Sequence, residues 1–245
     1  SRFNICSFFD NHGYASGHHT FECLLGVGVK RSFRVDTSSV AAARADTAVD
    51  SFKRLKSFYE EEPDWMFGHF AYDLKNETEA LSSRNSDRLN FPDLYFFVPE
   101  YVVKLSAQEI SISGASAATA GAIWMEINDM PLSLPPFSTE PEPIRIRSRF
   151  SKGEYEETVK TLQRHILKGD CYEINFCQEF YAEDVKLDPL TVYRNLSRVS
   201  PNPFSAYYRL DDKYLLCASP ERYMRKVKNQ VISQPIKGTG KRETG

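Results

Sequence analysis

The sequence predicts an α+β fold with more strand than helix and mostly antiparallel connections between strands. Two observations lead to this class. Short segments rich in aromatic and apolar residues recur along the chain, and turn-forming residues such as Asp211-Asp212-Lys213 separate several of them. Apolar residues at helical spacing are confined to fewer and longer stretches.

The first half of the chain is predicted to hold several strands and one clear helix. The helix spans 47–61, where apolar residues such as Phe52 and Leu55 recur at helical spacing between Lys and Glu residues. Residues 76–88 are polar and are predicted as a short helix or a loop. The predicted strands are 3–9, 21–29, 65–72 and a long strand at 94–105 that Pro99 interrupts and that pairs with 109–113.

A proline-rich stretch divides the sequence. Five prolines lie from Pro131 to Pro143, and this density excludes a helix or a central strand. We interpret the stretch as an extended crossing segment. Three regions are therefore predicted, at 1–130, 131–150 and 151–245.

The second half carries stronger local signals. Ser151 and Glu154 have the spacing of a capping box, and the helix that follows is predicted to end before Gly169. Asp188 and Pro189 suit the start of a second helix. The inward residues of the first helix are predicted to be Val159, Leu162, Ile166 and Leu167. The predicted strands are 171–180, with one buried face, and two hairpins at 204–219 and 223–236.

Composition excludes several classes of protein. In the 245 residues, 31 Lys and Arg against 33 Asp and Glu give a formal charge of −2, so no global charge favours nucleic acid or an anionic membrane. The 41% hydrophobic content is too high for a disordered chain, and no apolar run is long enough for a membrane span. Five cysteines without a CxxC pair predict neither a disulfide framework nor a zinc site, and favour a reducing cytoplasm.

The ends of the predicted 223–236 hairpin bring together two groups that can carry chemistry. Glu221 precedes the hairpin and Lys237 follows it, so a carboxylate and an amine are predicted to be neighbours. In one interpretation they form a surface ion pair that contributes about 0–1 kcal/mol. In the other, Lys237 is partly desolvated and acts as a nucleophile while Glu221 moves a proton. Gly238 allows a ligand to approach the backbone closely, and Thr239 offers a hydroxyl group to an anion.

Four motifs taken together resemble the chorismate-binding enzyme family. In chain order they are Gly-Asp-Cys-Tyr-Glu-Ile-Asn (169–175), Pro-Asn-Pro-Phe-Ser-Ala (201–206), Ser-Pro-Glu-Arg (219–222) and Pro-Ile-Lys-Gly-Thr (235–239). The segment 68–73 is similar to a weaker family motif. The resemblance implies a four-layer α/β/β/α fold with two packed, mostly antiparallel sheets, of which this chain holds the N-terminal part. It also identifies 151–245 as the first part of the chorismate-binding region.

Lys237 narrows the resemblance to one branch of the family. Anthranilate synthases typically carry alanine at this position, whereas lysine is typical of aminodeoxychorismate synthase component I. The resemblance implies that Lys237 attacks chorismate as a hydroxyl group leaves, and that ammonia then releases the lysine and gives 4-amino-4-deoxychorismate for para-aminobenzoate and folate synthesis. It implies that Glu221 is the general acid/base, that Gly238 and Thr239 contact the substrate, and that a separate glutamine amidotransferase subunit supplies the ammonia.

The resemblance implies two further features that this chain supplies only in part. Mg²⁺ is implied, but the magnesium-binding glutamates of the family match no position of these 245 residues. No metal ligand is therefore assigned, and the chain alone is expected to be inactive. Some members also bind tryptophan away from the active site, but the residues at the matching positions are better explained by packing alone. These positions are Asn11, His18, His19, Thr20, Phe21, Pro203, Phe204 and Ser205.

Other functions remain open at this point. The chain can belong to an anthranilate or isochorismate synthase, and the identity of the product and its dependence on ammonia distinguish these enzymes. It can also be a non-catalytic module that only binds a partner subunit. Such a module would keep its partner when Lys237 is replaced, whereas the enzyme would lose its covalent adduct.

Overall fold

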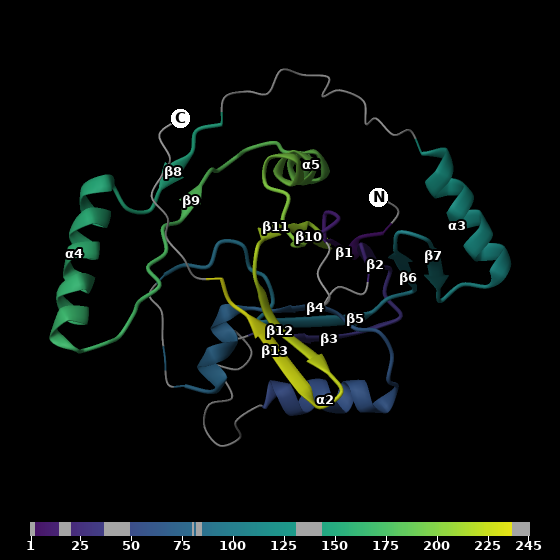
Figure 1. The fold of residues 1–245 in the computed structure, drawn as a ribbon, viewed down its shortest axis with the longest axis horizontal. Helices are drawn as coiled ribbons and strands as arrows, with labels where there is room; N and C mark the ends of the chain where they lie inside the picture. Colours follow the sequence, from purple (N-terminus) through teal and green to yellow (C-terminus); the bar gives the residue numbers. More distant parts are fainter. Residues whose placement is uncertain are drawn as a thin grey trace. The chain divides into compact units, whose positions relative to one another are not determined.

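The computed structural model describes residues 3–14, 21–36, 50–79, 81, 85–130 and 144–236 (Figure 1). The chain forms two compact units. One unit contains Ser1–Asp129 together with Asp188–Gly245, and the other contains Met130–Leu187. The proline-rich stretch from Pro131 to Pro143, the residues His18 to Thr20 and the residues from Lys237 onward lie outside the described residues.

The larger unit is built on a six-stranded antiparallel sheet with the strand order β11-β10-β1-β2-β6-β7. The predicted hairpin at 204–219 is present, and its first strand pairs directly with the first strand of the chain, so that Ile5 lies opposite Leu210. Segments from both ends of the sequence therefore share one sheet. The strands are β1 Ile5–Asp10, β2 Cys23–Val27, β6 Tyr101–Leu105, β7 Ile110–Ser113, β10 Phe204–Leu210 and β11 Lys213–Ser219.

A second antiparallel sheet has the order β3-β5-β4, with β3 Arg31–Val35, β4 Phe67–Phe70 and β5 Leu94–Val98. The long strand predicted at 94–105 is thus two strands in two different sheets. Pro99 lies between them, and because proline has no N–H to donate, the ladder ends there and the chain crosses from β5 to β6. Strand β3 was not among the predicted strands.

The two sheets pack against each other through aromatic side chains. The ring of Phe67 in β4 lies over Gly26 in β2, where a Cβ atom would be 2.8 Å from the ring. Phe67 also stacks on Phe9 of β1, with ring centroids 6.1 Å apart. The buried cluster between the sheets consists of Phe67, Tyr95, Phe97, Val102, Tyr208 and Leu210.

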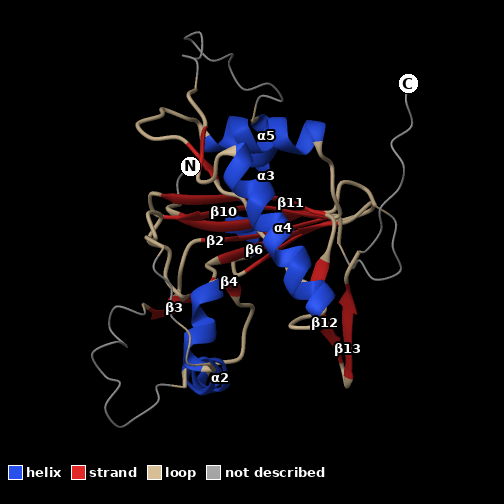
Figure 2. Ribbon diagram, turned by 90° about the vertical axis from the view of Figure 1, so that its left-hand side faces the viewer, coloured by secondary structure: helices blue, strands red, loops and turns tan. Residues whose placement is uncertain are grey.

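Helices cover the outer faces of both sheets. Helix α5 (Pro189–Val199) contacts β10 and β11 of the six-stranded sheet, and α2 (Ser51–Glu61) contacts β3 of the three-stranded sheet. Figure 2 shows the resulting order of helix, sheet, sheet and helix. The predicted α+β fold with two packed antiparallel sheets is therefore confirmed.

The starts of these helices agree with their sequence signals. Asp188 accepts a hydrogen bond from the Thr191 N–H at 2.9 Å, and Pro189 occupies the first turn of α5. Asp50 caps α2. Ser51, which is fully buried, donates from its N–H and its hydroxyl group to the carboxylate of Glu77 at the end of the 3₁₀ helix η1 (Tyr72–Glu77).

The smaller unit confirms one prediction and corrects two. Helix α4 (Lys152–Lys168) has the capping box of Ser151 and Glu154, and Gly169 adopts the left-handed conformation at φ 88°. Ile166 and Leu167, however, are exposed and not inward, at 37% and 88%. The strand predicted at 171–180 is also wrong, because only β9 (Phe180–Tyr181) pairs, with β8 (Arg147–Ser148).

The failed strand and one missed helix have physical explanations. Alternating residues form a strand only when a neighbouring strand accepts the backbone hydrogen bonds, and Tyr172, on the face predicted to be buried, is 93% exposed. Helix α3 (Ala117–Asp129) was not predicted, because its largely apolar sequence has no polar face to reveal the helical period. Among the described residues, no helix is long and apolar enough to cross a membrane.

His69 in β4 is a partly buried titratable group that contacts β10 of the other sheet. Its Nε2 lies 2.9 Å from the Pro92 carbonyl oxygen and its Nδ1 lies 3.2 Å from the Tyr208 hydroxyl. The neutral ring satisfies both contacts by donating to Pro92 and accepting from Tyr208. Burial, assisted by the positive charge of Arg34, lowers the pKa of His69, although the Pro92 contact opposes this shift.

This lowered pKa predicts a loss of stability in acid. Below about pH 6.5 the unfolded chain takes up a proton that the folded chain resists, so the free energy of unfolding falls until the folded pKa is reached. We expect His69→Gln to remove up to about 1.4 kcal/mol per pH unit of this dependence. Urea titrations of the complete protein and the variant between pH 7.5 and 5 measure it, and parallel pH profiles would contradict the assignment.

Candidate active site

Glu221 lies in a tight connection between two strands. β11 ends at Ser219 and β12 (Arg222–Val227) begins after Pro220 and Glu221. The Ser219 Oγ accepts a hydrogen bond from the Glu221 N–H at 3.2 Å and donates to the Glu221 carbonyl oxygen at 3.1 Å. The two hydrogen bonds hold the N–H and the carbonyl group of Glu221, and the ring of Pro220 fixes the φ angle just before it. The backbone of Glu221 is therefore restricted on both sides.

The predicted hairpin at 223–236 is present, and Glu221, just before it, contacts its far end. Strand β12 pairs with β13 (Gln230–Gln234), and Arg222 lies opposite Gln234. The Glu221 Oε1 accepts a hydrogen bond from the Ile236 N–H at 2.9 Å. The carboxylate therefore reaches the residue that directly precedes Lys237, while Lys237, Gly238 and Thr239 themselves lie outside the described residues.

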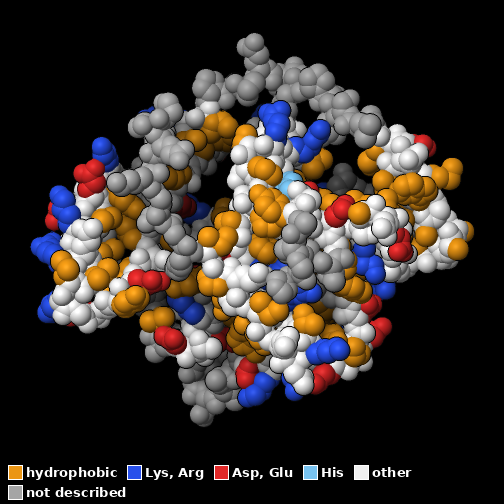
Figure 3. Space-filling view, viewed as in Figure 1, with side chains coloured by type: hydrophobic (Ala, Val, Ile, Leu, Met, Phe, Trp, Pro, Cys, Tyr) orange, Lys and Arg blue, Asp and Glu red, His pale blue; other side chains and the backbone are white. Residues whose placement is uncertain are grey.

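Two arginines of β12, Arg222 and Arg225, follow Glu221 in the chain. The Arg222 guanidinium lies over the ring of Phe204, 4.8 Å from its centroid. Burial, together with the positive charge of Arg225, lowers the pKa of Arg222, but an arginine remains charged at neutral pH. Elsewhere, on the face drawn in Figure 3, basic and acidic side chains are interspersed and not gathered by sign.

The described residues of the predicted tryptophan pocket, Asn11, Phe21 and 203–205, lie near one end of β1 and β10. Asp10 lies opposite Ser205, which places Asn11 next to the segment 203–205. Asn11 donates from its Nδ2 to the Phe21 carbonyl oxygen at 3.1 Å, and its Oδ1 accepts from the Gly13 N–H at 2.8 Å. His18, His19 and Thr20 are not described.

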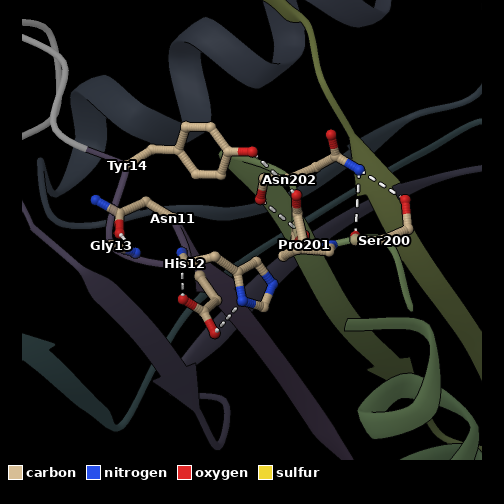
Figure 4. A network of polar contacts seen from close by, with 9 residues as sticks. Asn11, His12, Gly13, Tyr14, Ser200, Pro201 and Asn202 are labelled. Atoms are coloured by element: carbon tan, nitrogen blue, oxygen red, sulfur yellow. Dashed lines mark hydrogen bonds and ion pairs between the residues drawn. The ribbon is translucent and has the colours of Figure 1, made fainter. Parts of the chain in front are cut away.

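The polar contacts at this end serve the protein itself. Ser205 is 1% exposed, and its hydroxyl group donates to the Asn202 carbonyl oxygen at 2.9 Å. The Tyr14 hydroxyl donates to the Pro201 carbonyl oxygen at 3.3 Å and so joins the turn after β1 to the turn before β10 (Figure 4). In these contacts the polar groups bond to other parts of the protein, as the packing alternative expects. The tryptophan pocket stays a prediction.

Two cysteines of strands β1 and β2, Cys6 and Cys23, are poor nucleophiles. All five cysteines of the chain are free thiols. Burial, followed by the negative charge and hydrogen bond of Asp10, raises the pKa of Cys23 to about 12, and burial also raises the pKa of Cys6. Both are protonated at neutral pH, and a thiol must lose its proton to attack.

Sequence reasoning assigned a role to Glu221 but none to Ser219 or Arg222, although all three belong to one quoted motif. The spacing of Ser219 and Glu221 around a proline was the available signal, since serine hydroxyl groups often bond the backbone two residues on. No group of three or more His, Cys, Asp or Glu side chains that could hold a metal ion is found within the described ranges.

Sequence comparison adds an independent finding. The sequence model of the family described as chorismate binding enzyme matches residues 10–245. Aminodeoxychorismate synthase component 1 of Klebsiella aerogenes is 30% identical over 174 residues, which are 70% of this chain and 38% of that protein. Anthranilate synthase component 1 of Thermus thermophilus is 28% identical over 234 residues, which are 88% of this chain and 50% of that protein.

Structural comparison gives a similar result for the fold. Anthranilate synthase component I of Streptococcus pneumoniae superimposes with a TM-score of 0.66 over 89% of this chain and 54% of that chain, at 19% sequence identity. The chain thus spans between roughly a third and a half of the length of these relatives, from 38% to 54%.

Proposed function

This chain belongs to the chorismate binding enzyme family, and from that premise we propose that it carries the nucleophile and the general acid/base of an aminodeoxychorismate synthase component I. The complete protein would convert chorismate and ammonia to 4-amino-4-deoxychorismate for para-aminobenzoate and folate synthesis. Lys237 is the proposed nucleophile and Glu221 the proposed acid/base. Gly238 and Thr239 are the proposed substrate contacts.

The hydrogen bond from the Ile236 N–H to the Glu221 carboxylate supports this proposal most directly. It places the carboxylate one residue from Lys237, at the end of a two-stranded hairpin. A general acid must lie within hydrogen-bond reach of the group that it protonates. Because the next residue along the chain is the proposed nucleophile, we propose that Glu221 serves the leaving group on the same small substrate.

The proposed reaction has two covalent steps. In the first, the neutral Lys237 amine forms a C–N bond to the chorismate ring, the ring double bonds shift, and the 4-hydroxyl group leaves as water with a proton from Glu221. The ammonium formed in this step returns a proton to the Glu221 carboxylate. In the second step, ammonia forms a C–N bond at the 4-position, the ring double bonds shift back, and the bond to Lys237 breaks with its electron pair returning to the lysine nitrogen. The new ammonium loses its extra proton to solvent. Dividing one difficult displacement between two steps is the general advantage of a covalent nucleophile.

We propose that the complete protein uses a metal ion and a separate source of ammonia. We propose that it uses Mg²⁺; the described residues do not fit as its site, because no suitable ligand cluster occurs among them. We also propose that a glutamine amidotransferase subunit supplies ammonia, and that the protein works in the cytoplasm, whose reducing conditions suit five free thiols.

Anthranilate synthase is the second candidate function. A relative with that name is nearly as similar as the aminodeoxychorismate synthase relative, at 28% against 30% identity, and aligns with more of this chain. The two functions differ in the expected chemistry at residue 237. A covalent adduct requires the lysine, and the alanine typical of anthranilate synthases cannot form one.

Intact mass spectrometry of the complete protein tests the proposal. With chorismate and Mg²⁺ but no ammonia, we expect the mass of the protein to rise by that of chorismate minus one water. After proteolytic digestion, the gain should lie on the peptide that contains Lys237. Adding ammonia should remove the gain and release 4-amino-4-deoxychorismate. Formation of anthranilate or isochorismate without any adduct would contradict the proposal and assign the protein to another branch of the family.

A further inference from the structure

One side chain holds both backbone polar groups of Glu221. The Ser219 hydroxyl accepts from the Glu221 N–H at 3.2 Å and donates to the Glu221 carbonyl oxygen at 3.1 Å. Only Pro220 separates the two residues, and its ring removes one backbone rotation. The backbone at Glu221 is therefore restrained by a single hydroxyl group.

Ser219 is itself fixed by the six-stranded sheet. It lies opposite Phe204 in the ladder between β10 and β11. The Arg222 guanidinium, on the other side of Glu221, lies over the ring of the same Phe204 at 4.8 Å. The residues that flank Pro220 and Glu221 are thus both tied to one position of β10, and the connection cannot turn as a free loop would.

The restrained backbone determines where the Glu221 carboxylate points. Its Oε1 accepts from the Ile236 N–H at 2.9 Å. This contact links β11 to the far end of the β12–β13 hairpin, next to Lys237. If the Ser219 hydroxyl were absent, water could still satisfy the exposed backbone groups of Glu221, so the fold would survive while the carboxylate gained other orientations.

We propose that Ser219 is a positioning residue that directs the Glu221 carboxylate toward Ile236, the residue that precedes Lys237 in the sequence. The effect of Ser219 on the reaction rests on the proposed function, whereas its effect on the orientation of Glu221 does not. Ser219 touches neither substrate nor reacting atoms in this role and acts only through Glu221.

Amide hydrogen exchange at Ile236 tests the geometric part without any reaction. In the complete protein, Ser219→Ala is expected to speed exchange at Ile236 about tenfold, since the carboxylate that protects this amide loses its orientation. Ser219→Thr keeps the hydroxyl group and should restore slow exchange. Ser233→Ala removes an exposed hydroxyl group from β13 of the same hairpin and should change nothing.

Two further variants keep this measurement decisive. Glu221→Ala gives the exchange rate of Ile236 without the carboxylate, which is the upper limit for the effect of Ser219→Ala. Ser219→Cys keeps the side-chain shape and weakens its hydrogen bonds, so it replaces the alanine variant if that variant fails to fold. Unchanged exchange at Ile236 in Ser219→Ala, or in Ser219→Cys where it replaces the alanine variant, would overturn the proposal.

Steady-state kinetics test the catalytic consequence. In the complete protein, Ser219→Ala should lower kcat for amination about tenfold and change KM for chorismate less than about twofold, with rescue by Ser219→Thr. Faster exchange at Ile236 with wild-type kcat would overturn the positioning role. Faster exchange in a protein that does not aminate chorismate would refute the proposed function and leave the geometry of Glu221 supported.

Discussion

Replacing Lys237 with alanine is expected to abolish the chorismate adduct and to lower amination by the complete protein about 10³-fold or more. Glu221 contacts Ile236 at the end of the hairpin. Apart from Lys237, the next lysine along the chain is Lys241. The ammonia-free mass measurement gives the adduct, and product formation with excess ammonia gives the rate. Binding of chorismate should weaken much less than the rate falls.

Lys226→Ala is the matched control for this variant. Lys226 is an exposed lysine of β12 in the same hairpin, paired across the ladder with Val231, and its loss should change neither adduct nor rate. An adduct that persists in Lys237→Ala would refute the assignment of the nucleophile. A protein that shows no adduct, but whose partner subunit binds wild type and variant equally, would be the non-catalytic module.

The sequence predicted structure well where it depends on interactions between nearby residues, and poorly where it depends on contacts between distant ones. The hairpins at 204–219 and 223–236 were predicted because turn residues and alternation act within a few residues. The strand at 171–180 was wrong because its alternation requires a partner that the described residues do not provide. Only tertiary contacts could assign 94–98 and 101–105 to different sheets.

The candidate site divides in the same way. That Glu221 meets the end of the second hairpin followed from hairpin geometry, and the Ile236 contact agrees with it. The role of Ser219 could not be derived, because it depends on the conformation of the turn and on the pairing with Phe204. The sequence already left packing open for Asn11, but only the structure gave its contacts with Gly13 and Phe21.

Replacing Gly68 with alanine is expected to lower the free energy of unfolding by about 3 kcal/mol or more. Gly68 lies opposite Phe96 in the pairing of β4 and β5, and a Cβ atom there would be 1.9 Å from the Tyr95 carbonyl oxygen. The obstacle is backbone, so no side-chain rotation relieves it. Strand β5 must move, and it carries Leu94 and Phe97, which are both 0% exposed.

Gly121→Ala separates this steric effect from the general effect of removing a glycine. Gly121 lies within α3, and nothing is within 4 Å of a Cβ placed there. Alanine in a helix interior should therefore stabilise by about 0.4–1 kcal/mol. Urea unfolding and amide exchange in β4 and β5 measure both variants of the complete protein. Opposite signs are expected, and a Gly68→Ala variant within about 1 kcal/mol of wild type would show that β4 and β5 are not packed this closely.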